Sequence, residues 1–344
     1  MKALRYYDRN TLKVEEIPVP EIEEDEVLVE TKACGICSSD ILDWYREPRA
    51  PMFFGHEVTG TIVNIGKKVS AFSIGDRVFV HHHVPCMTCE YCASGNYSMC
   101  EAFRQSHLDP GGFSEYIRVP GENVRKGLIR LPDTLSFIEA TFIEPLACCI
   151  QAVQRASLRM GDRVVIFGAG FNGLLLLVLS CIFGGENPIV VEPNSYRARL
   201  ALELGARGVI SDASGNLNAA VRDLNGGKLA RVVFVTPPNT LAIQAAFDVV
   251  DRGGTILIYA PSPPGEVFNV DIFRIYFSQL TVRTSYSASP LETRQAVRFL
   301  EAKKEAFLKI PVTRYPFVAF EEAFSAIRKN PKVIKAVFDL TGTQ

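Results

Sequence analysis

The pattern of hydrophobic and polar positions changes near residue 140. Before that point, short β-branched runs at 27–29 and 60–80 are interrupted by Gly66 and Gly75, as in strands joined by turns. After it, residues 136–156 have helical spacing, and apolar strands then alternate with helices at 174–183 and 197–205. We expect these strands at 163–167, 188–192, 209–210, 231–235 and 255–259. This alternation predicts an α/β fold with a doubly wound parallel sheet.

The end of the chain differs again. A helix rich in Leu, Ala and Arg follows residue 290, and a closing strand is expected at 336–338. We interpret this segment as a return to the first domain. The predicted organisation is a β-rich domain from residues 1–150 and 290–344, with a nucleotide-binding domain at 151–289.

Composition narrows the function classes. The chain has 344 residues, is 47% hydrophobic, and carries a formal net charge of −1, so charge gives no reason to expect nucleic acid or an anionic membrane as partner. The most apolar run, 174–183, is far shorter than the roughly 20 residues that span a bilayer. Met1 opens directly into a strand-like pattern, so we expect no signal peptide and a cytoplasmic protein.

Four of the nine cysteines lie close together in a long irregular stretch at 81–120. Their spacing allows one loop to wrap four thiolates around a tetrahedral zinc ion, with no open coordination position. Such a site is structural, and it would order a loop that is otherwise too long for a compact domain. We therefore predict a structural zinc lobe at about 84–103, with Cys86, Cys89, Cys92 and Cys100 as ligands.

The sequence GAGFNG at 168–173 follows an apolar strand and opens a helix, which is the context that a dinucleotide-binding loop requires. Gly168 permits the tight turn, Gly170 lets the pyrophosphate approach the backbone, and Gly173 lets helix and strand pack closely. Glu192 ends the next strand, where a carboxylate accepts hydrogen bonds from the ribose hydroxyls and repels a 2′-phosphate. NAD is favoured over NADP, although Arg197 could soften that selection.

A second, open metal site is indicated in the first domain. Cys37 and His56 are good zinc ligands, and a carboxylate can complete a three-ligand set that leaves one position free. Glu144 lies among apolar residues, where a carboxylate needs a compensating partner such as a metal ion. The run His81, His82 and His83 is less suited to one ion, because consecutive strand residues point to opposite faces, and we expect it to be structural or at the surface.

These motifs together resemble the zinc-containing medium-chain alcohol/polyol dehydrogenases, including sorbitol and threonine dehydrogenases, over essentially the whole chain. The most specific stretch is GHEVTG at 55–60, continued by Gly66, Val69 and the GDRV at 75–78. The four-cysteine run, GFSEY at 112–116, EPL at 144–146 and the glycine loop follow in family order. The resemblance implies a GroES-like catalytic domain with an inserted Rossmann domain, and two zinc ions per chain.

The resemblance also implies roles for single residues. Cys37 and His56 match catalytic zinc ligands, and Glu57 and Glu144 match two acids that share the remaining positions with water; which of them binds directly stays open. Ser39 matches the hydroxyl of a proton relay, and Trp44 matches a residue of the substrate pocket. Cofactor contacts are implied for Asn172, Glu192, Arg197, Tyr259, Ala260 and Thr284.

The substrate class expected from this metal set is a secondary alcohol of a polyol, cyclitol or sugar derivative, oxidised to a ketone. An Arg-Tyr pair that helps sorbitol-type enzymes to hold a linear polyol is replaced here by Thr284 and Ser285, which puts sorbitol itself in question. A threonine-type amino-alcohol dehydrogenase is the second hypothesis, and a non-catalytic NAD-binding relative the third. By the same resemblance we expect a homotetramer or a homodimer, with residues 268–282 apolar enough to take part.

Overall fold

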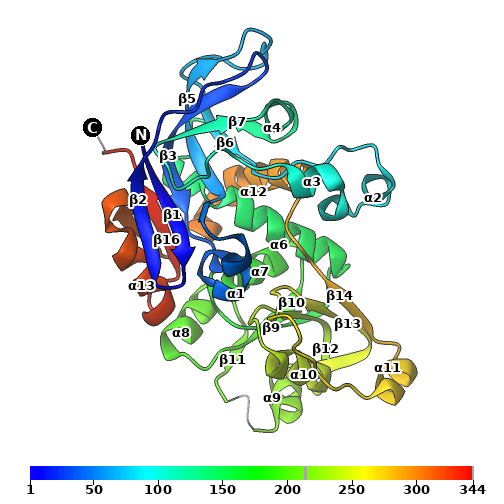
Figure 1. Cartoon of the computed structure of the whole chain (residues 1–344). Helices are drawn as coiled ribbons and strands as arrows, with labels where there is room; N and C mark the ends of the chain where they lie inside the picture. The colour runs from blue at the N-terminus through cyan, green and yellow to red at the C-terminus, as the bar shows by residue number, and fades with distance from the viewer. Residues whose placement is uncertain (213–214, 343–344) are drawn as a thin grey trace. The chain divides into compact units, whose positions relative to one another are not determined.

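The computed structural model describes residues 1–212 and 215–342, and they form two compact units. The first comprises Met1–Ala147, Ala288–Lys304 and Pro311–Gln344, and the second Cys148–Ser287 and Glu305–Ile310. The chain thus passes from the first unit into the second and returns (Figure 1). Helices α6 (Ile143–Arg155) and α12 (Pro290–Leu308) contain residues of both units.

The first unit is built on two sheets. A small antiparallel sheet has the order β2 (Thr11–Glu16), β1 (Lys2–Asp8), β4 (Met52–Phe53). The larger sheet has the order β15 (Val312–Pro316), β16 (Lys335–Asp339), β3 (Val27–Gly35), β5 (Glu57–Ile65), β6 (Arg77–Val80), β8 (Leu128–Arg130), and β7 (Tyr116–Val119) also pairs with β3. Strand β16 joins residues near the C-terminus to β3, with Val337 opposite Gly35. The core of this unit therefore draws on both ends of the chain.

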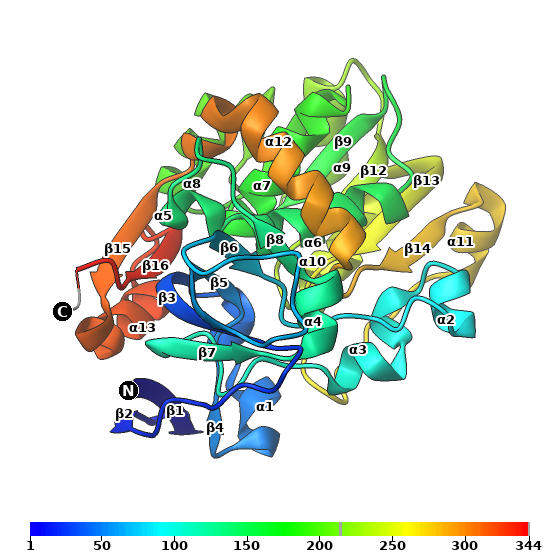
Figure 2. The same cartoon turned by 90° about the horizontal axis from the view of Figure 1, so that it is seen from above.

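Short helices and 3-10 turns connect these strands. They are η1 (Ser38–Ile41), α1 (Asp43–Arg46), η2 (Glu47–Arg49), α2 (Glu90–Ala93), η3 (Tyr97–Met99), α3 (Glu101–Gln105), α4 (Gly121–Lys126), α5 (Phe137–Ala140), η4 (Phe317–Ala319) and α13 (Phe320–Lys329). Figure 2 shows α13 beside β15 and β16. The segment at 136–156 is two helices rather than one, since α5 ends at Ala140 before α6 begins at Ile143.

The second unit contains a six-stranded parallel sheet. Its order is β11 (Gly208–Ile210), β10 (Glu186–Val191), β9 (Arg163–Phe167), β12 (Ala230–Val235), β13 (Val250–Ile258), β14 (Thr281–Thr284). The first strand in sequence, β9, lies between β10 and β12, which is the doubly wound order of a Rossmann sheet. The predicted α/β class is confirmed.

Helices connect the strands of this sheet. They are α7 (Phe171–Ile182), α8 (Ser195–Glu203), α9 (Leu217–Leu224), α10 (Thr240–Val249) and α11 (Ile272–Ser278). Strand residues such as Val165, Val233 and Ile256 are fully buried, because helices cover a parallel sheet on both faces. Within the described residues, none of the helices has the length and apolar character needed to cross a membrane.

Candidate active site

The predicted catalytic metal ligands come together in the first unit. Ligand atoms of Cys37, His56 and Glu57 all lie within 4.8 Å of one another. Cys37 caps η1, two residues after β3 ends at Gly35, whereas Glu57 begins β5 and His56 directly precedes it. The antiparallel pairing of these strands, with Gly35 opposite Glu57, brings the two segments together. Thiolate, imidazole and carboxylate form a donor set that suits zinc.

Asp40 organises this donor set, and sequence reasoning had given it no role. Its Oδ2 accepts a hydrogen bond of 3.0 Å from the backbone N–H of Cys37, and its Oδ1 lies 3.7 Å from Nδ1 of His56. The guanidinium of Arg46 forms a buried ion pair with the same carboxylate. A carboxylate on the outer nitrogen of a metal-binding histidine fixes the ring orientation and increases its basicity. The sequence signal for Asp40 is its place three residues after Cys37, from which its carboxylate can accept from the backbone N–H of Cys37.

The electrostatics of His56 agree with this role. Burial alone lowers the pKa of its imidazole, but the charge of Asp40 and the hydrogen bond to Cys37 oppose it. The net result is a pKa well above the ordinary value. The pocket therefore favours positive charge at this ring, and a cation bound there would be favoured for the same reason.

Glu57 is completely buried and forms an ion pair with Lys335, which is 2% exposed. Lys335 also donates a hydrogen bond of 3.1 Å to the backbone carbonyl of Ile36. The second carboxylate oxygen of Glu57, Oε1, is buried without a hydrogen-bond partner among the described residues. Burial raises the pKa of Glu57, and the charge of Lys335 opposes that rise. An orphaned buried oxygen beside a thiolate and an imidazole fits a metal ligand.

Lys335 could not have been found from local sequence, because 278 residues separate it from Glu57. The other predicted acid, Glu144, lies near the start of α6 and is 4% exposed. Its negative charge raises the pKa of both His56 and Glu57, so it faces the same region. The three-residue ligand group contains Glu57, and Glu144 is not a member of it.

The remaining site predictions in the first unit lie near this group in sequence. Ser39 is half-buried in η1, two residues after Cys37. Trp44 is half-buried in α1, where its ring meets that of Tyr45 at 5.9 Å between centroids. Cys34 is fully buried in the main hydrophobic cluster, and burial raises the pKa of its thiol well above the usual value.

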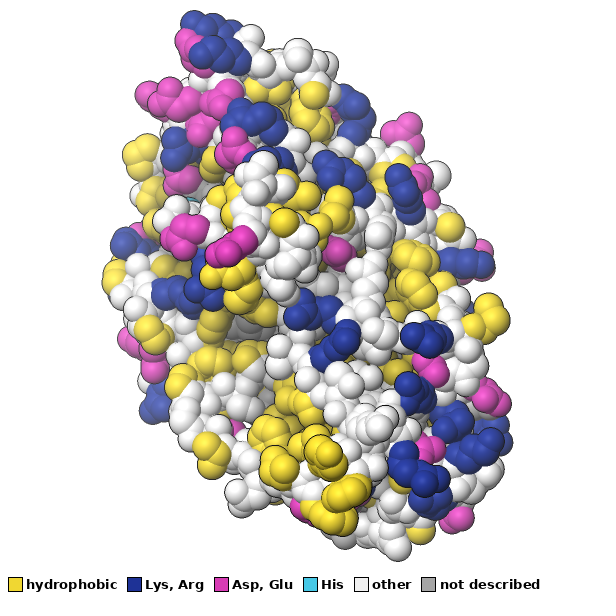
Figure 3. Space-filling model, turned by 90° about the vertical axis from the view of Figure 1, so that its right-hand side faces the viewer, with side chains coloured by type: hydrophobic (Ala, Val, Ile, Leu, Met, Phe, Trp, Pro, Cys, Tyr) yellow, Lys and Arg dark blue, Asp and Glu magenta, His cyan; other side chains and the backbone are white. Residues whose placement is uncertain are grey.

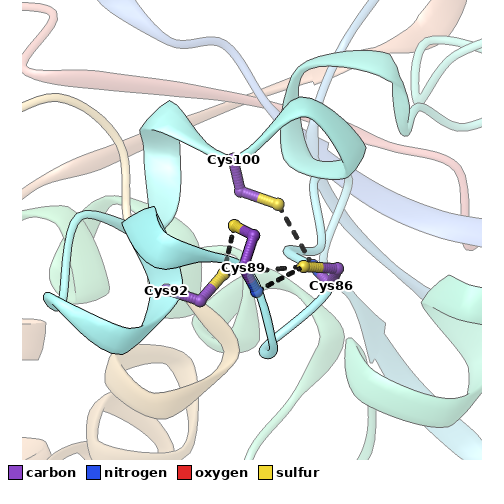
Figure 4. A group of neighbouring side chains, drawn as sticks. All are labelled: Cys86, Cys89, Cys92 and Cys100. Atoms are coloured by element: carbon purple, nitrogen blue, oxygen red, sulfur yellow. Dashed lines mark hydrogen bonds between the residues drawn. The ribbon is translucent and has the colours of Figure 1, made fainter.

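The four cysteines of the lobe converge as the spacing predicts (Figure 4). Sulfur atoms of Cys89 and Cys92 lie 3.6 Å apart, and those of Cys86 and Cys92 lie 3.9 Å apart. Four sulfurs at about 2.3 Å from a tetrahedral zinc lie about 3.8 Å from one another, so the separation fits. Hydrogen bonds from the Thr88 hydroxyl and nearby backbone N–H groups lower the pKa of Cys86 to about 5, which favours the thiolate that binds metal.

The dinucleotide loop lies between β9 and α7 in the second unit. Gly168 has φ of +87°, and a Cβ on Gly173 would lie 2.0 Å from the carbonyl oxygen of Gly168. A Cβ on Gly170 would meet nothing within 4 Å, which leaves this backbone open to a ligand. Glu192 accepts hydrogen bonds from the backbone N–H groups of Ala169 at 2.7 Å and Asn194 at 2.8 Å.

The other predicted cofactor contacts are spread over the same unit. The Cys149 thiol lies 3.7 Å from the carbonyl oxygen of Asn172 and 3.6 Å from the hydroxyl of Tyr259, so it joins these two residues. Ala260 follows Tyr259 directly after β13, and Thr284 ends β14. The side chain of Asn194 caps α8 and accepts from the backbone N–H of Arg197.

Two family models match the chain, the first inside the first unit and the second mainly in the second unit. Residues 23–133 match the family model described as alcohol dehydrogenase GroES-like domain, and residues 173–302 match zinc-binding dehydrogenase. Sorbitol dehydrogenase of Bacillus subtilis is 33% identical over 276 residues, which cover 78% of this chain and 77% of the relative. The chain belongs to the zinc-containing medium-chain alcohol/polyol dehydrogenase family. It is therefore an alcohol dehydrogenase-type oxidoreductase with a GroES-like and a Rossmann-type domain.

Two further relatives illustrate the range of the family. L-threonine 3-dehydrogenase of Bacillus velezensis is 30% identical over 329 residues, covering 93% of this chain and 92% of the relative. A zinc-binding dehydrogenase of Sinorhizobium meliloti 1021, whose structure was solved bound to NADP, has a TM-score of 0.86 and 26% identity, with 98% of each chain covered. The relatives from Bacillus subtilis and Bacillus velezensis are thus named for different substrates, sorbitol and L-threonine.

Proposed function

We propose that this protein is an NAD-dependent zinc dehydrogenase that oxidises a secondary alcohol of a polyol, cyclitol or sugar derivative to a ketone. The observation that carries the proposal is the convergence of Cys37, His56 and Glu57, with buried counter-charges behind them. With Glu57 and Glu144 as its two acids, the metal set resembles that of polyol dehydrogenases rather than the Cys-His-Cys set of ethanol-type enzymes. Residues 1–150 and 290–344 would form the catalytic domain and 151–289 the NAD-binding domain.

When bound, zinc supplies a Lewis acid that lowers the pKa of a coordinated hydroxyl, as it lowers that of bound water to about 7. Cys37 and His56 would hold the ion, with Glu57 or Glu144 completing the set. Asp40, 3.7 Å from Nδ1 of His56, would hold the His56 ring in its binding orientation. The Ser39 hydroxyl would take the proton from the substrate alcohol and pass it on toward the cofactor ribose and solvent. Trp44 would line the pocket and exclude water.

The choice of NAD rests on Glu192. Both of its oxygens accept from backbone N–H groups, which hold the carboxylate in place, and its remaining lone pairs would accept from the adenosine ribose hydroxyls. A 2′-phosphate would meet this negative charge, whereas Arg197 on α8 could partly offset it. Asn172, Tyr259, Ala260 and Thr284 would complete the cofactor contacts. Steady-state kinetics with NAD and NADP compared side by side test this assignment, and a tenfold preference for NADP would refute it.

Two zinc ions per chain are proposed, one at Cys37 and His56 and one in the four-cysteine lobe. The lobe ion would support stability and take no direct part in the reaction, because its four thiolates leave no open coordination position. Metal analysis of wild-type protein and of Cys37→Ser tests this count. Two equivalents falling to one are expected.

The substrate class is tested by a panel of primary alcohols, polyols, inositols, amino alcohols and sugar phosphates. Best turnover on ethanol or another primary alcohol would exclude the proposal. The alternative is a threonine-type amino-alcohol dehydrogenase, favoured by the similarity to L-threonine 3-dehydrogenase over 93% of this chain. Threonine as best substrate would decide for it. A non-catalytic NAD-binding protein would oxidise no alcohol, and Cys37→Ser would then change no activity.

We further propose that the protein is cytoplasmic and assembles with copies of itself, as a homotetramer or alternatively a homodimer. Strand β14 lies at the end of its sheet, and the neighbouring α11 exposes Ile272, Phe273, Tyr276 and Phe277, each at least 65% accessible. Figure 3 shows hydrophobic side chains gathered on the lower part of this face. An edge strand can pair with its own copy across a twofold axis, which favours a second copy as partner. Light scattering of wild-type protein and Phe273→Asp tests this assembly.

A further inference from the structure

A row of aromatic rings leads from the proposed catalytic metal site to the four-cysteine lobe. The ring of His56 lies 4.8 Å from that of His82, His82 lies 4.2 Å from His83, and His83 lies 5.0 Å from Phe103, between centroids. Phe103 belongs to the buried cluster that contains Cys92 and Cys100. The row therefore begins at a proposed metal ligand and ends against the cysteines of the lobe.

The row is anchored on its sides by hydrogen bonds to the backbone. The buried amide of Asn123 donates to the carbonyl oxygens of His81 and His82, at 2.9 and 3.0 Å. The ring of His81 turns away and meets the carbonyl oxygen of Ala288 at 3.2 Å. Nδ1 of His83 meets the carbonyl oxygen of Ser106, just beyond α3 of the lobe. These contacts fix the three consecutive histidines and leave His82 as the one that touches His56.

Ring packing, rather than hydrogen bonding to the described residues, accounts for the position of the His82 side chain. Its Nδ1 is buried and has no hydrogen bond to any described residue. Its ring contacts His56, His81 and His83 at tilts of 44°, 77° and 48°. The contact with His56 is a tilted packing of two rings, whereas Asp40 faces the edge of His56 at Nδ1. The two neighbours thus restrain different rotations of the same imidazole.

We propose that His82 is a positioning residue that holds the His56 imidazole by ring packing and, through His83 and Phe103, makes that position depend on the order of the four-cysteine lobe. This inference rests on the metal site proposed above at Cys37 and His56. The lobe then supports the catalytic site through a specific path and not only through general stability.

The test is titration of the metal-free full chain with Co²⁺, followed by visible absorption. The part of the binding that is lost in Cys37→Ser defines the catalytic site. We expect His82→Leu, which fills the volume without a flat ring, to weaken this site about tenfold or more and to shift its absorption bands, because outer residues of metal sites contribute affinity of that order. His82→Phe keeps the flat ring and is expected to stay within threefold of wild type. His107→Ala is the matched control, because it removes an exposed histidine from a neighbouring loop.

A second arm tests the path to the lobe. Cys100→Ser is expected to weaken the Cys37-dependent site in the wild-type background and to have little further effect in His82→Leu. Unchanged affinity and spectrum in His82→Leu would overturn the inference, as would equal weakening in His82→Leu and His82→Phe, or additive effects of His82→Leu and Cys100→Ser. A wild-type chain with no Cys37-dependent Co²⁺ binding would instead overturn the proposed metal site itself.

Discussion

Replacing Lys335 by methionine gives a sharp test of how the site is held. Lys335 and Glu57 are 2% and 0% exposed, and they form an ion pair in which Lys335 also bonds to the carbonyl of Ile36. Methionine keeps the apolar length but leaves the Glu57 charge buried and unpaired. Removing one partner of a buried ion pair costs about 3–5 kcal/mol, and we expect a loss near the lower figure in the metal-free protein. Bound metal should reduce this loss, because it compensates the same carboxylate.

The assay is urea unfolding followed by fluorescence of Trp44, the only tryptophan of the chain, which lies in the first unit. Glu57→Gln and the double variant complete a mutant cycle. The double variant removes both charges, so it should cost at least about 2 kcal/mol less than the sum of the two single changes. A loss below about 1 kcal/mol in Lys335→Met, or additive single effects, would refute the reasoning.

The same variant carries a pH dependence. Burial raises the pKa of Glu57, and Lys335 is the main group that lowers it, so Lys335→Met should raise it further. A carboxyl group whose folded pKa exceeds its unfolded value loses stability as pH rises from the unfolded value toward the folded one. The cost of Lys335→Met should therefore be smaller near pH 5 than near pH 8. A pH-independent cost would contradict this account.

Three further outcomes are expected. Gly170→Ala should fold normally, because its Cβ meets nothing within 4 Å, yet it should bind NAD at least tenfold more weakly. Gly173→Ala should be destabilised, because its Cβ would lie 2.0 Å from the carbonyl oxygen of Gly168. Calorimetry measures the difference in stability between the two variants, and NAD titration measures the difference in affinity. Glu192→Ala removes the carboxylate that would accept from the ribose hydroxyls and repel a 2′-phosphate, so fluorescence titration should show NAD affinity falling at least tenfold while NADP affinity falls less. Cys100→Ser should lose one zinc equivalent by metal analysis and unfold at a lower temperature; an unchanged metal content would contradict the lobe assignment.

Local sequence determined much of this protein. The four cysteines lie within 15 residues, so chain geometry alone brings their sulfurs together, and the glycine loop is specified by its neighbours β9 and α7. The alternation of apolar strands and helices likewise predicted the parallel sheet, because parallel strands need crossover connections, whereas the order of the strands is seen only in the structure. Cys37 and His56 were predicted as a pair from the resemblance of their motifs, and the pairing of β3 with β5 brings their segments together.

Only the tertiary structure decided what surrounds the proposed metal ligands. Lys335 reaches Glu57 because β16 joins the sheet beside β3, and no local pattern predicts a pairing across 278 residues. The contact between His82 and His56 also depends on strand pairing. Strand β6 pairs with β5, so the three histidines that follow β6 lie close to His56, which precedes β5. The sequence identifies the chemical groups of the site. Long-range strand pairing decides which charged groups and rings lie beside them, and these neighbours control the pKa values and orientations of the proposed ligands.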